Sequence, residues 1–360
     1  MHKFRLTETL RTTVAATLIA TVGTFAAGSV ACAKTINIME TGSTLLYPLF
    51  NLWVPAYHQM RSNVRINTQG TGSGTGIAEA ISGVAQIGAS DAYMSDMQVK
   101  QNPDLLNIPL AISAQNINYN IPGLNNIHLK LNGPVLAGIY DGQIRDWNNP
   151  AIQRLNPGVH LPARTITPIH RTDGSGDTFI FSQYLSFSTP AWNDRVGYGT
   201  TISWPAVQGG LGAIGNPGMV QAAAQTPYSI AYIGVSFTRE AQRAHLGTAM
   251  IENRAGEFLL PTPRTVEAAA QQLVAKTPRD ERISLVFAPG KMSYPIINYE
   301  YAMVNARQAD AATATALRDF LNWAVSLKGG NAPRFLKQVR FIALPPRISA
   351  LSREQIAKIR

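Results

Sequence analysis

Three short segments combine small residues, hydroxyl side chains and a nearby charge, as an oxyanion site requires. They are the first loop, residues 40–44 (Glu-Thr-Gly-Ser-Thr), the second loop, residues 70–76 (Gly-Thr-Gly-Ser-Gly-Thr-Gly), and the third loop, residues 171–178 (Arg-Thr-Asp-Gly-Ser-Gly-Asp-Thr). Each follows an apolar run and precedes a stretch of helical period, so each predicts the start of a helix. The unpaired N–H groups of a helix start carry partial positive charge, hydroxyls add donors, and glycine lets an anion approach the backbone.

A single loop of this kind has a simpler explanation, because serine, threonine and aspartate also cap ordinary helices. Three such loops in one chain favour anion binding, and Arg171 strengthens this because a guanidinium can hold an oxyanion with two hydrogen bonds. The glycine spacing of dinucleotide-binding proteins, the Gly-Lys-Ser/Thr of a P-loop and the Gly-x-Ser-x-Gly of hydrolases are all absent.

The segments that must position these loops alternate between strand-like and helix-like patterns. We predict strands over 35–39, 64–68 and 85–89, with helices over 44–60 and 76–83 between them. This order is typical of a parallel sheet in an α/β domain.

The rest of the chain suggests a second domain inserted into the first. We predict a strand over 165–170, a helix over 179–185 and an amphipathic helix over 311–327. Residues 121–295 are richer in glycine, proline and asparagine, and we interpret them as the inserted part.

Composition limits the possible partners. The chain of 360 residues has 31 lysines and arginines against 21 acidic residues, a net charge of +10, which suggests an acidic partner. Aromatic residues do not alternate with basic ones, so we expect no nucleic acid partner. A single cysteine excludes a disulfide scaffold and a cysteine-based zinc site. No metal or other cofactor is expected.

The N-terminus has the pattern of an export signal. Basic residues at the start are followed by a short apolar stretch and by Ala-Cys-Ala at 31–33, so we predict a cleaved signal peptide over 1–33 and a periplasmic protein. Two alternatives are a membrane anchor, for which the apolar stretch is short, and a lipid attached to Cys32.

Four ordered motifs together resemble a known family. They are Thr-Gly-Ser-Thr at 41–44, Gly-Thr-Gly-Ser-Gly at 70–74, Ile-Gly-Ala-Ser-Asp at 87–91 and Arg-Thr-Asp-Gly-Ser-Gly at 171–176. In this order and spacing they resemble the periplasmic phosphate-binding proteins of high-affinity phosphate ABC transporters, which are type II periplasmic binding proteins. Shorter similar stretches at 120–123, 139–147, 155–158 and 232–234 extend the likeness over most of the chain.

The resemblance implies a fold and a set of ligand contacts. Two α/β lobes joined by crossing strands would close on phosphate in the cleft between them, with lobe 1 formed by 34–116 and 296–360 and lobe 2 by 117–295. The family's phosphate contacts, carried over residue by residue, would be Ser43, Thr44, Leu45, Ser73, Asp91, Arg171, Asp173, Ser175, Gly176 and Asp177. Leu45 would contribute only its backbone N–H.

Asp91 is the residue expected to select the ligand. A carboxylate repels an anion unless the anion offers it a proton, and phosphate near neutral pH keeps a proton whereas sulfate has none. The alternative for Asp91 is an N-cap of a helix beginning near Ala92.

The other two aspartates have different expected roles. Asp173 is expected to pair with Arg171 and orient its guanidinium. Asp177 stands where many family members have threonine. Its side chain either accepts a second proton from the ligand or leaves the contact to its backbone N–H.

These observations predict a binding protein without catalysis that captures inorganic phosphate and passes it to the membrane permease of an ABC transporter. We expect it to act as a monomer. One alternative is a secreted phosphatase that uses Ser73 or Ser175 with Arg171, but no activated nucleophile or metal-ligand spacing accompanies these serines. The other alternative is the same fold with a different oxyanion.

Overall fold

The computed structural model describes residues 35–360. The predicted signal peptide, its cleavage site and Cys32 lie outside these described residues. No helix formed by residues 35–360 combines the length and the hydropathy of a membrane span.

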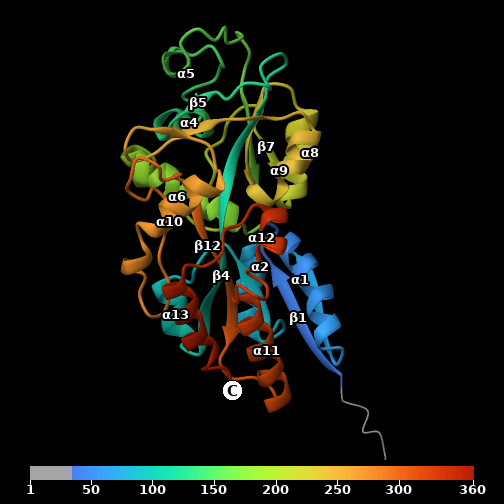
Figure 1. Cartoon of the computed structure of the whole chain (residues 1–360). Coiled ribbons are helices and arrows are strands. Elements are labelled where there is room, and N and C mark those ends of the chain that lie inside the picture. Colours follow the sequence, from blue (N-terminus) through green and yellow to red (C-terminus); the bar gives the residue numbers. More distant parts are fainter. Residues whose placement is uncertain (1–34) are drawn as a thin grey trace, which may run out of the picture. The chain divides into compact units, whose positions relative to one another are not determined.

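The first half of the sheet carries the first and second loops. Its strands lie in the order β2-β1-β3-β12-β4 (Figure 1). Their bounds are β1 Ile36–Gly42, β2 Val64–Gly70, β3 Ile87–Ser90, β4 Leu105–Asn120 and β12 Ile297–Asn305. β1 pairs in parallel with β2 and β3, whereas β12 runs antiparallel to β3 and β4. Parallel neighbours place the loops that follow β1, β2 and β3 at one edge of the sheet.

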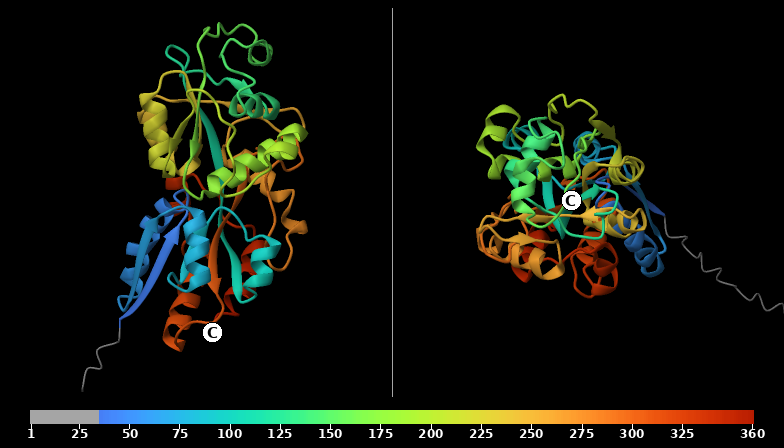
Figure 2. Two further views of the ribbon diagram at one scale, coloured as in Figure 1. Left: turned by 180° about the vertical axis from the view of Figure 1, so that it is seen from behind. Right: turned by 90° about the horizontal axis from the view of Figure 1, so that it is seen from above.

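The second half of the sheet carries the third loop. Strand β4 pairs with β12 as far as Ala114 and with β8 from Gln115 onward, so one strand belongs to both halves. Strand β6 (Thr167–Arg171) lies parallel to β8 (Ser229–Gly234) and β7 (Leu211–Ala213). Figure 2 shows the long strand β4 running from one group of elements into the other.

Helices cover both halves of the sheet. The long ones are α1 Tyr47–Met60, α2 Ser73–Ser82, α6 Gly176–Ser188, α8 Gly215–Gln225, α11 Ala311–Ala324 and α13 Pro346–Ile356. The shorter ones are α3 Asp96–Gln101, α4 Gly133–Tyr140, α5 Pro150–Leu155, α7 Pro190–Arg195, α9 Thr238–Arg243, α10 Pro263–Gln271 and α12 Pro333–Val339, with 3-10 turns at Val235–Phe237 and Val274–Lys276. The remaining strands are β5 Lys130–Leu131, β9 Gly247–Thr248, β10 Met250–Glu252 and β11 Phe258–Leu259.

The predicted elements exist, but several helix bounds were wrong. The helix predicted from residue 44 begins at Tyr47, because Ser43 Oγ accepts the N–H groups of Leu45 and Leu46 in a preceding turn. The helix predicted from residue 76 begins at Ser73, so residues 73–76 of the second loop form the first turn of α2. The helix predicted over 179–185 extends to Gly176–Ser188, and the one predicted to end at 327 ends at Ala324.

The helix considered at Ala92 does not form. The next helix, α3, begins at Asp96, and Ser95 caps it by accepting Gln98 N–H. Asp91 is therefore not an N-cap, so that alternative was wrong.

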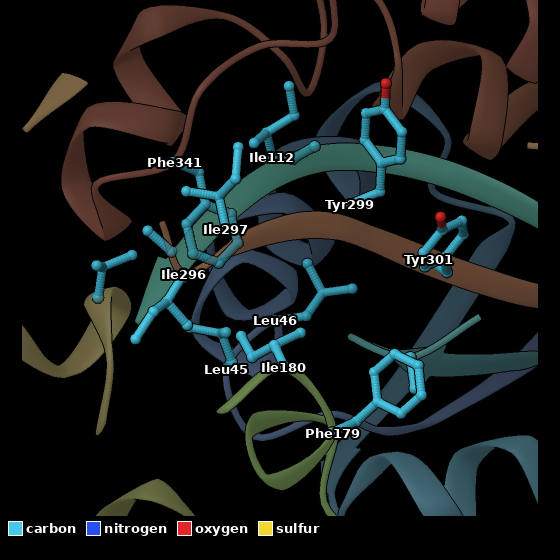
Figure 3. Close-up of a cluster of buried hydrophobic side chains, with 14 of the residues drawn as sticks. Leu45, Leu46, Ile112, Phe179, Ile180, Ile296, Ile297, Tyr299, Tyr301 and Phe341 are labelled. Carbon is cyan, nitrogen blue, oxygen red and sulfur yellow. The ribbon is translucent and has the colours of Figure 1, made fainter. Parts of the chain in front are cut away.

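A continuous apolar core lies under the first and third loops and holds them in position. Side chains from the first loop, α6, β4 and β12 belong to one buried cluster (Figure 3). Leu45 and Leu46, which directly follow the first loop, are fully buried in it, as is Ile180 of α6. Because the first and third loops are anchored in the same core, their polar groups are held close to each other.

Glu40 gives the fold an unusual dependence on pH. It lies at the start of the first loop, is fully buried, and accepts a hydrogen bond from Thr68 Oγ1. Burial raises its pKa to about 8. The folded state therefore binds more protons than the unfolded state between pH 4.5 and about 8, and stability falls as pH rises through this range.

Replacing Glu40 with glutamine is expected to remove this dependence. The variant should have a free energy of unfolding higher by about 2 to 4 kcal/mol than the unmodified protein at about pH 9, and little difference at about pH 4. Urea unfolding at both pH values tests this, with Glu257→Gln at an exposed position as the control. Equal gains at both pH values would contradict it.

Candidate functional site

The three loops and the residue after β3 meet in one buried site. The first loop follows β1, the second follows β2, Asp91 follows β3, and the third loop follows β6. Ser43, Ser73, Asp91 and Ser175 are each at most 1% exposed. The structure thus brings together polar side chains that are up to 132 positions apart in the chain.

The first loop is tied to Asp91. Ser43 Oγ donates to Asp91 Oδ1 and accepts the N–H groups of Leu45 and Leu46 at 3.1 and 3.0 Å. Leu45 N–H, predicted as a ligand donor, therefore points at Ser43 in this structure. Thr44 Oγ1 accepts both the backbone N–H and the side-chain amide of Asn216, each at 3.1 Å.

The second loop contacts both Asp91 and the third loop. Ser73, the first residue of α2, accepts the backbone N–H of Asp91 through its Oγ at 3.2 Å. Gly74 N–H donates to Gly174 O at 2.8 Å. Gly72 has a φ of +97°, and a Cβ there would lie 2.7 Å from Gly174 O, so glycine is required for this close approach.

Arg171 is held by two aspartates of its own loop. Its Nε donates to Asp173 Oδ1 at 2.6 Å, its Nη2 donates to Asp173 Oδ2, and its Nη1 donates to Asp177 Oδ2 at 2.9 Å. The predicted pairing of Arg171 with Asp173 is confirmed. Burial opposes ionisation of Asp173, but its hydrogen bond with Arg171 and the guanidinium charge outweigh burial and lower its pKa.

The bonds to the two aspartates do not use every N–H group of the guanidinium. It has five N–H groups, and three of them form the bonds to Asp173 and Asp177. The other two remain on the same rigid group, whose plane the aspartates fix. The arrangement is suited to hold an oxyanion with two hydrogen bonds.

The side chain of Asp177 is engaged by protein donors. Besides the hydrogen bond from Arg171, its carboxyl group accepts one from Asn216 Nδ2 at 2.7 Å and one from Gln115 Nε2 at 3.0 Å. Burial, followed by the nearby charge of Asp91, raises its pKa to about 7. Because three donors already surround the carboxyl group, the geometry favours a supporting role for it over direct contact with a ligand.

The beginning of α6 completes the site. Ser175 caps this helix, its Oγ accepting Thr178 N–H at 3.1 Å. Gly176 approaches Asp91 and the second loop so closely that a Cβ at this position would overlap Asp91 Oδ2 and lie 2.5 Å from Ser73 Oγ. The third loop is thus in direct contact with the second loop and with Asp91.

Sequence reasoning missed three buried polar residues of this site. Asn216 follows β7 in Gly-Asn-Pro-Gly, the same pattern of a strand, small residues and a helix, so that signal was present. Gln115 and Glu300 lie within strands β4 and β12. The only signal for them was a polar residue in an otherwise apolar run.

The site holds many acidic groups and a single arginine. Asp91, Asp173 and Asp177 carry carboxyl groups close to Arg171, and Glu300 adds a further carboxyl group beside Asp91. Burial raises the pKa of Asp91, and also of Asp177 and Glu300. Among the described residues, no group of three or more histidine, cysteine or acidic side chains has the arrangement of a metal site.

Comparison with known proteins places this chain in a family. The model of the PBP superfamily domain matches residues 15–328. The phosphate-binding protein PstS of Xylella fastidiosa strain 9a5c is 32% identical over 315 residues, which cover 88% of this chain and 83% of the relative. The phosphate-binding protein PstS of Methanocaldococcus jannaschii is 33% identical over 344 residues, 91% and 85% of the two chains. The chain belongs to the PstS family of phosphate-binding proteins.

Solved structures share the fold of this PstS family member. The periplasmic phosphate-binding protein PfluDING, solved with bound phosphate, has a TM-score of 0.71 at 19% identity and covers 89% of this chain and 93% of its own. A phosphate-binding protein from Stenotrophomonas maltophilia has a TM-score of 0.68 at 17% identity, with 89% and 94% covered. The two-lobed α/β fold predicted from the motifs is confirmed.

Proposed function

We propose that this PstS family protein captures inorganic phosphate at the buried site and delivers it to the permease of an ABC transporter outside the cytoplasm. The observation that carries the proposal is Asp91, a buried carboxyl group that accepts from Ser43 Oγ, contacts Ser73 through its backbone N–H and lies close to the positive charge of Arg171. Such an arrangement holds an oxyanion that still carries a proton. The PstS relatives are named for binding phosphate, which is that kind of anion.

We assign the donors as the sequence motifs imply. Hydrogen bonds to phosphate come from Ser43, Thr44, Leu45, Ser73, Arg171, Ser175 and Gly176. Asp173 orients Arg171. Asp177 contributes its backbone N–H to phosphate, while its side chain holds Arg171, Asn216 and Gln115 in place. Several of these groups bond to one another in the structure, so phosphate entry exchanges loop-to-loop hydrogen bonds for bonds to the ligand. This exchange keeps buried donors satisfied in both states.

The lobes are assigned as 34–116 with 296–360, and 117–295. The change of partner along β4 between Ala114 and Gln115 supports the first boundary, and the start of β12 at Ile297 supports the second. Because the loops of both lobes are in contact and bury the site, the lobes must separate to admit phosphate. This motion suits a carrier that releases its ligand at a permease, and it needs no catalytic group.

Titration calorimetry tests the proposal. The protein lacking residues 1–33 is expected to bind one phosphate per chain, and sulfate in large excess should not compete, because it offers Asp91 no proton. Competition by sulfate at the concentration of phosphate would contradict the role of Asp91. Steady release of product from a chromogenic phosphate ester would favour the phosphatase alternative. The Arg171→Lys variant, purified in the same way, is the control, because a contaminating enzyme would give the same rate in both preparations.

A further inference from the structure

A second buried carboxyl group stands behind Asp91. Glu300 lies in the middle of β12, between β3 and β4, and is fully buried. The next residue, Tyr301, pairs with Ser90 of β3, directly before Asp91, and a β-bulge occurs at this point of β12. Asn298 of the same strand donates to Asp91 O at 2.7 Å. β12 thus presents two polar side chains to the Asp91 segment.

The two carboxyl groups must share a proton. Glu300 lies two residues after Asn298 on the same face of β12, so its carboxyl group faces the Asp91 segment that Asn298 contacts, and the two carboxyl groups interact there. Ser113 Oγ of β4 donates to Glu300 Oε1. The other charges that act on this pair are Asp177 of α6 and Arg171 of β6. Two carboxylates this close in a buried site cannot both be ionised, so one of them carries a proton and donates it to the other.

The surroundings decide which group carries the proton. The Asp91 carboxyl group receives a hydrogen bond from Ser43 Oγ and lies in the field of the positive charge of Arg171, and both favour its ionised form. Glu300 has one protein donor, Ser113, and its Oε2 has no partner donor among the described residues. Burial raises the pKa of both, and the negative charge of Asp91 raises that of Glu300 further.

We propose that Glu300 is a positioning residue for selectivity: a neutral carboxylic acid that donates a hydrogen bond to Asp91 and so keeps Asp91 ionised and aimed at the ligand. The proposal rests on the proposed phosphate-binding function. A carboxylate has about four acceptor positions. Donors from Ser43 and Glu300 hold it in place, and an acceptor position on Asp91 Oδ2, which faces Gly176, serves the proton of phosphate.

Two substitutions separate this role from a structural one. Glu300→Gln keeps both contacts, because its carbonyl can accept from Ser113 and its amide can donate to Asp91. Glu300→Leu is similar in size and keeps neither. Affinities for phosphate and sulfate are measured by calorimetry for both variants and the unmodified protein from about pH 5 to about pH 9.

We expect Glu300→Gln to stay within about threefold of the unmodified protein at every pH. Glu300→Leu should bind phosphate at least tenfold more weakly near pH 6 and should admit sulfate there, because Asp91 without its donor takes up a proton and becomes a donor itself. Its selectivity should return as pH rises. If both variants behave alike, or if Glu300→Leu keeps a selectivity that does not change with pH, the proposal is wrong.

An infrared difference spectrum between the unmodified protein and Glu300→Gln tests the proton directly and does not depend on folding of the leucine variant. A protonated carboxyl C=O band at about pH 8 that disappears in Glu300→Gln supports the proposal, and its absence overturns it. If the unmodified protein bound no phosphate, the proposed function would fail, whereas this band would still report the proton on Glu300.

Discussion

Replacing Arg171 with lysine is expected to weaken phosphate binding by about two to three orders of magnitude. The guanidinium bonds Asp173 and Asp177 through three N–H groups, and the proposed function assigns the other two to phosphate. A lysine ammonium has three donors at a single point, so it cannot reach both aspartates and the ligand. A hydrogen bond to a charged group contributes about 1.5 to 2 kcal/mol, so the loss of two such bonds to phosphate corresponds to the expected loss of affinity.

The matched control is Arg307→Lys. Arg307 pairs with Asp104 at 3.1 Å, but its side chain is 69% exposed, and pairs of this kind contribute little. Calorimetry and thermal unfolding are measured for both variants. A phosphate affinity of Arg171→Lys within fivefold of the unmodified protein would show that the guanidinium is not part of the ligand contact.

Replacing Gly176 with alanine is expected to weaken phosphate binding by about 10- to 100-fold. The added Cβ would overlap Asp91 Oδ2 and lie 2.5 Å from Ser73 Oγ, so the third loop must move away from the second loop and from Asp91. Overpacking of this kind costs about 1 to 3 kcal/mol. Since alanine favours helix over glycine at the start of α6, the helix itself should not be weakened.

Gly218→Ala in α8 is the matched control for this prediction. A Cβ at Gly218 would lie 3.7 Å from its nearest neighbour, which is ordinary contact. Its phosphate affinity should equal that of the unmodified protein. Far-ultraviolet circular dichroism checks that both variants fold. Equal affinities for Gly176→Ala and Gly218→Ala would show that the loops do not close on the ligand as the structure suggests.

The loops illustrate how far sequence reasoning reached. Their glycines, hydroxyls and Arg171 predicted an anion site because each loop carries its own signal within a few residues. The pairing of Arg171 with Asp173, two positions apart, was predicted for the same reason and is confirmed. Helix starts were less accurate, because Ser43 and Ser73 take different positions relative to the first turn in α1 and α2.

The missed residues show where such reasoning stops. Gln115, Asn216 and Glu300 come from β4, the start of α8 and β12, and only the sheet order places them beside Asp91 and Asp177. No local pattern connects Glu300 with Asp91, because 209 positions separate them in the chain. The open question about Asp177 also needed the structure, since its three donors come from three separate segments.

By itself, the sequence determined the family, the α/β class and the chemical character of the three loops, because these depend on residue types that lie close together in the chain. The tertiary structure decided which of those groups face one another, which donors Asp177 already uses, and that a second carboxyl group lies against Asp91. The physical reason is burial. Whether a carboxyl group is ionised, and whether it accepts or donates a hydrogen bond, depends on the water that packing removes and on the partners that packing supplies.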